Sequence, residues 1–252
     1  MSKAAYIGVG DKARKIKAIY VGDSSGKARR VTAGYVGVGG VARQFFATGP
    51  VIGDLEAGSI VRLNVSGKAT EFIVAHQGLP SDQYDASCDG TWLVMKDIHA
   101  KDVWGNVNLY EGSTISIAME QVFYGKLDKG VQSIVMQADV PWKDTTVRRH
   151  VFPLTAAEVG LTGSDIYRTG AKLDYFLSDV STPAVERRVA NYNGKVSGWF
   201  TRDAVTTDSA SVCEIGTIGR IQILQAIEQS GYRPAMILPR ETRVSEDGTI
   251  IV

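Results

Sequence analysis

Three aspartates in the polar stretch Ser81–Asp89 are the residues best placed to bind a metal ion: Asp82, Asp85 and Asp89. Carboxylate oxygens are ligands that Ca²⁺ prefers. The spacing lacks the EF-hand pattern, however, and aspartates in polar stretches commonly organise turns. The sequence therefore predicts no metal site, and calcium at these aspartates is the alternative that stays open.

The histidines and cysteines form no catalytic motif. His76, His99 and His150 are scattered, and no second histidine or cysteine lies at zinc-ligand spacing from any of them. Cys88 and Cys213 are predicted to be free, buried thiols, with a single disulfide as the alternative. No Gly-x-Ser-x-Gly elbow is present. We therefore expect no catalytic residues, no cofactor and no enzymatic activity.

The elements that must position any site are read from the apolar pattern. Strands are predicted at 51–57, 59–65, 70–75, 91–96, 187–192, 195–202, 211–215, 218–226 and 234–238, with a final hairpin at 244–252. Helices are predicted at 113–124, with Ile115, Met119, Val122 and Phe123 on one face, at 130–136, and at 155–158 from a capping-box spacing. This combination predicts an α+β fold that is irregular and rich in loops.

The first 46 residues repeat one pattern three times, with copies that begin at Tyr6, Tyr20 and Tyr35. Each copy has an apolar half, a glycine-rich middle and a basic half that ends in Ala-Arg, which is typical of a β-hairpin. A single two-stranded hairpin is marginally stable in water. The repeats, residues 1–48, are therefore predicted to anchor and oligomerise the chain, and residues 49–252 to form a separate domain.

Charge and hydropathy restrict the partners and the compartment. Residues 1–46 carry nine Lys or Arg and two Asp, a net charge of +7, whereas the remainder has a net charge of −6. Opposite charges on the two parts favour docking between copies or partners. The basic residues form no dense run, so nucleic acid is not an expected partner. No apolar stretch predicts a membrane span or a signal peptide, so we expect synthesis in the cytoplasm.

The segment FIVAHQGLPSDQYDASCDGTWLVMKDI, residues 72–98, is the most distinctive in the chain, and 151–160, 173–176, 198–202 and 231–239 accompany it. Together these segments resemble a domain of unknown function that is common in prophages of Firmicutes. The N-terminal repeats resemble the glycine-rich, Ala-Arg-containing repeats that often precede this domain in phage tail proteins. The resemblance implies a C-type-lectin-like fold for roughly residues 51–240.

The lectin-like resemblance also suggests roles for individual residues. Large or paired side chains would form the structural core: Trp92, Trp199, Arg202, Arg233 and Pro234. Polar residues between the Trp-x-x-Arg strand and the Gly-x-Arg-Pro-Ala strand would contact a ligand: Asp203, Thr206, Thr207, Asp208, Glu214, Arg220 and Gln222. For any one of these polar residues, ordinary loop polarity is the alternative.

These observations lead to one expected function and one rival. We expect a non-enzymatic virion protein of a phage tail or baseplate, a homotrimer through its repeats, whose lectin-like domain binds a glycan or protein on the host surface. The rival is a structural or decorating virion component whose second domain contacts other tail or baseplate subunits. A broad exposed apolar patch would favour the rival, and an exposed aromatic surface would favour glycan binding.

Overall fold

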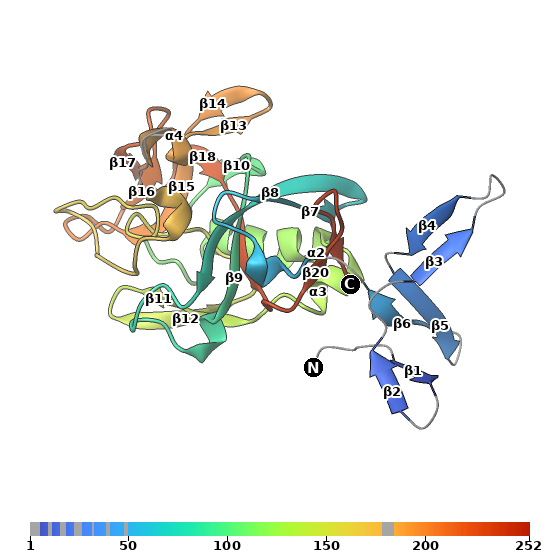
Figure 1. Cartoon of the computed structure of the whole chain (residues 1–252). Coiled ribbons are helices and arrows are strands. Elements are labelled where there is room, and N and C mark those ends of the chain that lie inside the picture. Colours follow the sequence, from blue (N-terminus) through green and yellow to red (C-terminus); the bar gives the residue numbers. More distant parts are fainter. Residues whose placement is uncertain are drawn as a thin grey trace.

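The computed structural model describes residues 6–9, 12–15, 19–22, 27–31, 33–38, 41–47, 50–177 and 184–252. The repeats form three separate antiparallel hairpins, as predicted: β1 (Tyr6–Val9) with β2 (Lys12–Lys15), β3 (Ile19–Gly22) with β4 (Ala28–Val31), and β5 (Ala33–Val38) with β6 (Val41–Ala47). These hairpins lie to one side of the larger body (Figure 1).

A four-stranded antiparallel sheet forms one layer of the larger body, in the order β19 (Ala235–Leu238), β9 (Gly90–Met95), β8 (Lys68–Gly78) and β7 (Ile60–Val65). Every residue of β9 is buried, which explains its continuous apolar run. The C-terminal strand β19 pairs with β9 so that Ile237 lies opposite Trp92. Residues far apart in the sequence therefore share the centre of this sheet.

A five-stranded sheet holds five of the twelve predicted site residues: Trp199, Arg202, Asp203, Glu214 and Gln222. Its order is β10 (Ala100–Val103), β18 (Gln229–Tyr232), β15 (Trp199–Ala204), β16 (Ser211–Ile215) and β17 (Ile221–Gln225). All residues of β15 and β16 are buried, whereas β17 is an edge strand with exposed positions.

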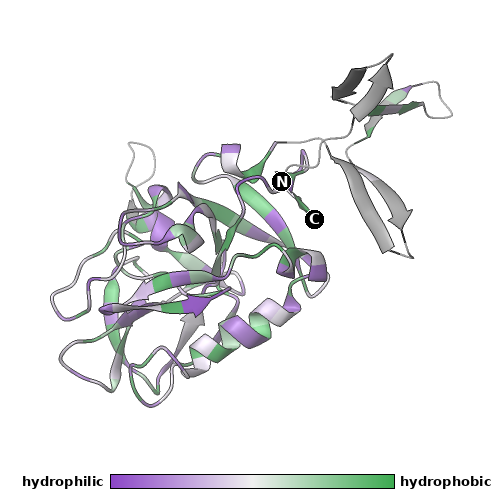
Figure 2. Ribbon diagram, turned by 90° about the horizontal axis from the view of Figure 1, so that it is seen from below, coloured by the Kyte–Doolittle hydropathy of each residue, from purple (hydrophilic) through white to green (hydrophobic). Residues whose placement is uncertain are grey.

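The helix predicted at 113–124 is present as α1 (Thr114–Ile117), a π-helical segment (Ala118–Phe123) and α2 (Tyr124–Lys126), along which polar and apolar residues alternate (Figure 2). The hydroxyl of Ser113 accepts a hydrogen bond from the backbone N–H of Ser116 and caps the start. Val122, expected on the buried face, is 49% exposed. The wider π turn, with its i→i+5 hydrogen bonds, changes the period of 3.6 on which that expectation rested.

The predicted α+β, loop-rich class is wrong, because the chain is mostly β-sheet, with 41% strand and 15% helix. The hairpin of β11 (Ala138–Trp142) and β12 (Thr145–Arg149) was not expected. Only Val147 is buried among the five residues of β12, so the strand carries almost no apolar alternation to recognise. The remaining helices are short: α3 (Lys129–Gln132) and α4 (Ala184–Arg188).

Three local predictions also fail. Residues 51–57 contain a 3-10 turn (Ile52–Asp54) instead of a strand, and 155–158 forms turns instead of a helix. Residues 187–192 divide between α4 and β13 (Ala190–Tyr192), which forms a hairpin with β14 (Lys195–Ser197). The C-terminal hairpin is present as β20 (Arg243–Val244) and β21 (Ile250–Ile251). Among the described residues, no helix is long and apolar enough to cross a membrane.

Candidate ligand-binding surface

The five residues expected in the core are buried in the region that joins the two sheets. The indole N–H of Trp92 donates to the carbonyl oxygens of Gly78 and Cys88, at 3.2 and 3.1 Å. The indole N–H of Trp199 donates to the carbonyl of Arg188 at 2.9 Å. These bonds satisfy the polar atom of each indole inside an apolar environment.

Arg233 is 1% exposed and lies over the ring of Trp199, with 5.3 Å between its guanidinium carbon and the ring centroid. Its Nε donates to the carbonyl oxygen of Met95 at 2.7 Å, and the carbonyl of the adjacent, buried Pro234 accepts from the Met95 N–H at 2.8 Å. Burial lowers the pKa of Arg233 to about 10.

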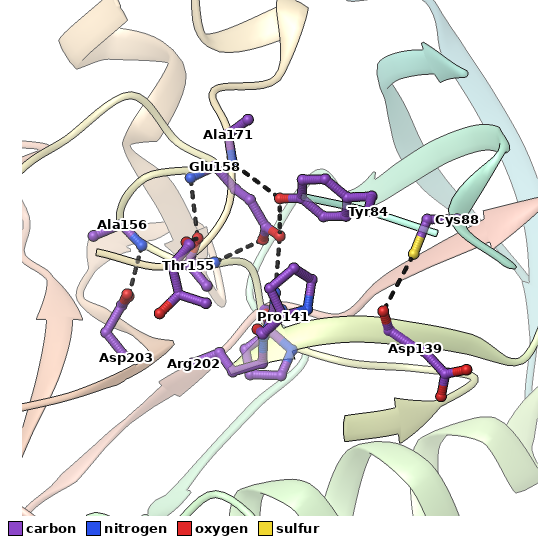
Figure 3. A network of polar contacts seen from close by, with 12 residues as sticks. Tyr84, Cys88, Asp139, Pro141, Thr155, Ala156, Glu158, Ala171, Arg202 and Asp203 are labelled. Carbon is purple, nitrogen blue, oxygen red and sulfur yellow. Dashed lines mark hydrogen bonds and ion pairs between the residues drawn. The ribbon is translucent and has the colours of Figure 1, made fainter. Parts of the chain in front are cut away.

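Arg202 is fully buried and pairs with Glu158, at 2.8 Å between Nη2 and Oε1 (Figure 3). Its Nε donates to the carbonyl of Pro141 at 2.9 Å, and its Nη1 donates to the carbonyl of Pro153. Burial is the largest single influence and acts to lower the pKa of Arg202, but the combined attraction of Glu158, Tyr84 and Tyr110, with the hydrogen bond to Glu158, raises the pKa above its ordinary value. The ion pair therefore ties β15 to the β11–β12 hairpin and to the 153–158 loop.

Glu158 is also the acceptor for a second set of donors. The backbone N–H of Thr155 donates to Glu158 at 2.8 Å, and the Thr155 hydroxyl accepts from the Glu158 N–H at 3.1 Å, which is the predicted capping-box exchange. The Tyr84 hydroxyl donates to Glu158 at 2.9 Å and accepts from the Ala171 N–H at 3.0 Å. The capping box is present without a helix, because its glutamate is shared with Arg202 and Tyr84.

Asp203, predicted to contact a ligand, is 2% exposed. Its Oδ2 accepts a hydrogen bond from the backbone N–H of Ala156 at 2.6 Å, as drawn in Figure 3. Burial raises the pKa of Asp203 to about 6. Arg202 and Asp203 therefore both contact the 153–158 segment, Arg202 through the Pro153 carbonyl and Glu158, and Asp203 through the Ala156 N–H.

The loop that follows β15 carries the exposed candidates Thr206, Thr207 and Asp208. The backbone N–H of Thr206 donates to the carbonyl of Asp165 at 2.8 Å. The carboxylate of Asp208 accepts from the Ser211 hydroxyl at 2.5 Å and from the Ala210 N–H at 2.9 Å, and the Ser211 bond lowers its pKa. This loop is therefore fixed at its base, with its side chains toward solvent.

Two aromatic residues that the sequence did not suggest, Trp142 and Tyr167, share one lysine, and Tyr167 belongs to the segment that pairs with residues 204–206. The ammonium of Lys143 lies 4.6 Å from the ring centroid of Trp142 and 5.2 Å from that of Tyr167. All three side chains are partly exposed, and the Tyr167 N–H donates to the carbonyl of Ala204 at 3.2 Å. We define the aromatic–polar surface as these residues and the exposed loop: Trp142, Lys143, Tyr167, Thr206, Thr207 and Asp208.

The remaining candidates lie elsewhere on the five-stranded sheet. Glu214 is 7% exposed and accepts a hydrogen bond from the Ser230 hydroxyl, and burial raises its pKa. Arg220 and Gln222 are exposed, at the start of β17 and on it. The seven candidates therefore occupy the interior, the aromatic–polar surface and the sheet edge, and only Thr206, Thr207 and Asp208 lie together at the surface.

The candidate metal loop and the histidines have local partners. Asp85 accepts from the Ser87 N–H at 2.7 Å and caps a 3-10 turn (Ala86–Cys88). His76 lies 2.8 Å from Asp174, and His150 lies 2.7 Å from Glu120. Within the described ranges, no group of three His, Cys, Asp or Glu residues could hold a metal ion.

The third histidine and the two cysteines are buried groups. Burial, with a smaller contribution from Lys126, lowers the pKa of His99 to about 4. Cys88 and Cys213 are buried free thiols, as the sequence predicts, and burial raises the pKa of each to about 12. A thiol with so high a pKa is a poor nucleophile at neutral pH.

The protein is therefore a β-rich domain in which the exposed loop 206–208 follows strand β15, and Arg202 of that strand forms a buried ion pair with Glu158. The chain belongs to the family described as Domain of unknown function (DUF6273), whose family model matches residues 89–240. That range includes β9, Glu158, Arg202 and the whole aromatic–polar surface. No curated protein and no solved structure matches the chain. Nothing in these comparisons links it to phage tail proteins or to lectin-like domains.

Proposed function

We propose that this protein is a non-enzymatic virion component of a phage tail or baseplate. Its N-terminal repeats anchor and oligomerise it as a homotrimer among other tail or baseplate proteins. Its second domain binds a glycan or protein of the host surface. The phage assignment rests on the resemblance of the repeats and of residues 72–98 to phage-associated sequences.

The aromatic–polar surface is the observation that carries the binding role. Aromatic rings offer apolar faces on which sugar rings stack, while hydroxyls and carboxylates hydrogen-bond to sugar hydroxyls. Trp142 and Tyr167 flank one lysine, and the exposed hydroxyls of Thr206 and Thr207 belong to the neighbouring loop. Because the Nε of Arg202 donates to the carbonyl of Pro141, next to Trp142, the strand that carries Trp142 is held in place before a ligand arrives.

The hairpins support the oligomeric part of the proposal. Each hairpin pairs only two strands, and such a unit needs neighbours to bury its faces. Three copies around a threefold axis provide neighbours on every side.

Binding to intact Gram-positive cells and to their purified wall polysaccharide tests the role of the surface. The double variant Trp142→Ala, Tyr167→Ala should lose about 2 kcal/mol of binding free energy, or roughly thirtyfold in Kd, because aromatic anchors dominate such contacts. Tyr192→Ala is the matched control, since Lys101 lies 5.4 Å from the Tyr192 ring centroid and Tyr192 belongs to the separate β13–β14 hairpin. Equal binding by both variants and the unmodified chain would refute the proposed site.

A decorating role is the second candidate, and exposed isoleucines around β17 favour it. Ile218, Ile223 and Ile227 are 62%, 47% and 66% exposed. Apolar groups of this kind suit a contact between subunits. Binding to purified tails but not to cells or wall polysaccharide would select this candidate.

A further inference from the structure

The outer edge of β17 offers backbone groups for pairing. Hydrogen bonds from Gly216 N–H to the Arg220 carbonyl (2.8 Å) and from Ala226 N–H to the Ala210 carbonyl (2.7 Å) fix the phase of the β16–β17 ladder. In an antiparallel ladder the inward-facing residues alternate, so Ile221 and Ile223 direct N–H and C=O away from β16. No hydrogen bond joins these outward groups to another described residue.

The other edge strands of the two large sheets are protected. The N–H of Arg62 on β7 donates to the carbonyl of Gly248 at 2.8 Å, and β19 exchanges hydrogen bonds with Phe152 at 2.9 and 3.0 Å. The edge strand β10 carries the charged residues Lys101 and Asp102. In contrast, β17 reads Ile-Gln-Ile-Leu-Gln and has neither a charge nor a proline. An uncharged, apolar open edge is a template for another strand.

We propose that two copies of the chain associate by antiparallel pairing of β17 with β17 of the second copy, about a twofold axis at Ile223. Ile223 then lies opposite its counterpart, and the two residues exchange two N–H···O=C bonds. Gln222 lies opposite Leu224, and the exposed Ile218 of one copy lies beside Ile227 of the other. The exposed isoleucines around the strand are thereby buried by the same interface.

Charge complementarity favours β17 of a second copy of the chain as the strand that pairs with this edge. Arg220 and Glu228 are exposed, carry opposite charges and lie at opposite ends of β17. In the proposed register Arg220, which precedes β17, lies opposite Ala226 of the other copy, and Glu228 follows Ala226 in the turn after β17. The attraction between Arg220 and Glu228 therefore occurs twice. Glu228 also receives the Gln225 N–H at 2.9 Å and returns its own N–H to the Gln225 carbonyl, which limits the pairing to the centre of the strand.

The mass of the full chain in solution, measured by analytical ultracentrifugation, tests the pairing. Ile223→Lys places two ammonium groups opposite each other and should halve the mass of the assembly. Val196→Lys is the matched control, because Val196 is 48% exposed on β14. An unmodified chain with the mass of Ile223→Lys, or an equal loss in Val196→Lys, would overturn the proposal.

A charge exchange provides an independent measurement. Arg220→Glu and Glu228→Arg should each weaken the pairing, and the double variant should restore it, because the opposite charges then meet again. Failure of the double variant to recover the mass would show that the contact is not made. The proposal does not depend on the aromatic–polar surface, so loss of ligand binding leaves it untouched.

Discussion

Arg202 and Arg233 are both buried, and the protein accommodates their charges differently. Arg202 has a carboxylate partner, Glu158, at 2.8 Å. Arg233 has the face of Trp199 and the Met95 carbonyl, and its Nη1 has no hydrogen-bond partner among the described residues. The pKa of Arg202 is raised because the combined attraction of Glu158 and two nearby tyrosines outweighs burial, and the pKa of Arg233 is lowered by burial.

The two arginines illustrate two ways in which a buried charge can stabilise the packing around it. A buried ion pair makes each partner necessary, because removal of one leaves a charge without compensation. A buried arginine on an aromatic ring leaves no second charge behind when it is replaced. The region below the aromatic–polar surface uses the ion pair, and the junction between the sheets uses the aromatic contact.

Arg202→Met should have the largest effect. Glu158 would remain buried and unpaired, so the free energy of unfolding should fall by about 3–5 kcal/mol. Urea denaturation measures this change. The double variant Arg202→Met, Glu158→Gln removes both charges and should recover part of the loss. A single variant as stable as the double variant would show that the pair contributes little.

Asp203→Asn should change the pH dependence of stability. The pKa of this carboxyl is about 6 in the folded state and 3.8 as its ordinary value. Its contribution to stability is therefore complete below pH 3.8 and is lost as the pH rises through about 6. The loss amounts to about 3 kcal/mol. The asparagine variant retains an acceptor for the Ala156 N–H and should be more stable than the unmodified chain at pH 8. Parallel stability curves from pH 4 to 8 would contradict this expectation.

Arg233→Met should cost less than Arg202→Met. One hydrogen bond and one cation–π contact are lost, and no carboxylate is left unpaired, so the expected cost is about 2 kcal/mol. The same urea measurement gives the comparison directly. A cost as large as that of Arg202→Met would abolish the distinction between the two arginines.

Tyr84→Phe should have the smallest effect. It removes one donor to Glu158 and one acceptor for the Ala171 N–H, while the ion pair persists, and about 1 kcal/mol should be lost. Chemical denaturation detects a change of this size. A loss near that of Arg202→Met would mean that Tyr84, instead of Arg202, holds Glu158 in place.

Local patterns predicted parts of the fold well. The repeats indicated hairpins, and the strand predicted at 211–215 matched β16. These features depend on neighbouring residues alone. The class was wrong because β10 and β12 carry little apolar alternation and are stabilised by contacts with distant segments.

The candidate site was only partly predictable. Thr206, Thr207 and Asp208 follow a strand and are exposed, as sequence reasoning assumed. Asp203 precedes them by a few positions but points inward, because its partner is the N–H of Ala156. Trp142 and Tyr167 belong to other segments and reach the surface only through tertiary packing. The one sequence feature that could have indicated this surface is Trp142 next to Lys143, at the turn of the β11–β12 hairpin that was not expected from the sequence.

The pairing of β19 with β9 has a consequence for how the protein is made. Ile237 must reach Trp92, and Ile52 must reach Thr242, before the four-stranded sheet is complete. Contacts of such long sequence separation slow folding, since a large loop must close first. During translation β9 therefore pairs with β8 first, and its second edge stays unpaired until residues 235–238 have left the ribosome. A nascent chain released shortly before residue 235 would expose this edge to aggregation, so completion of the sheet depends on a segment that is synthesised long after β9.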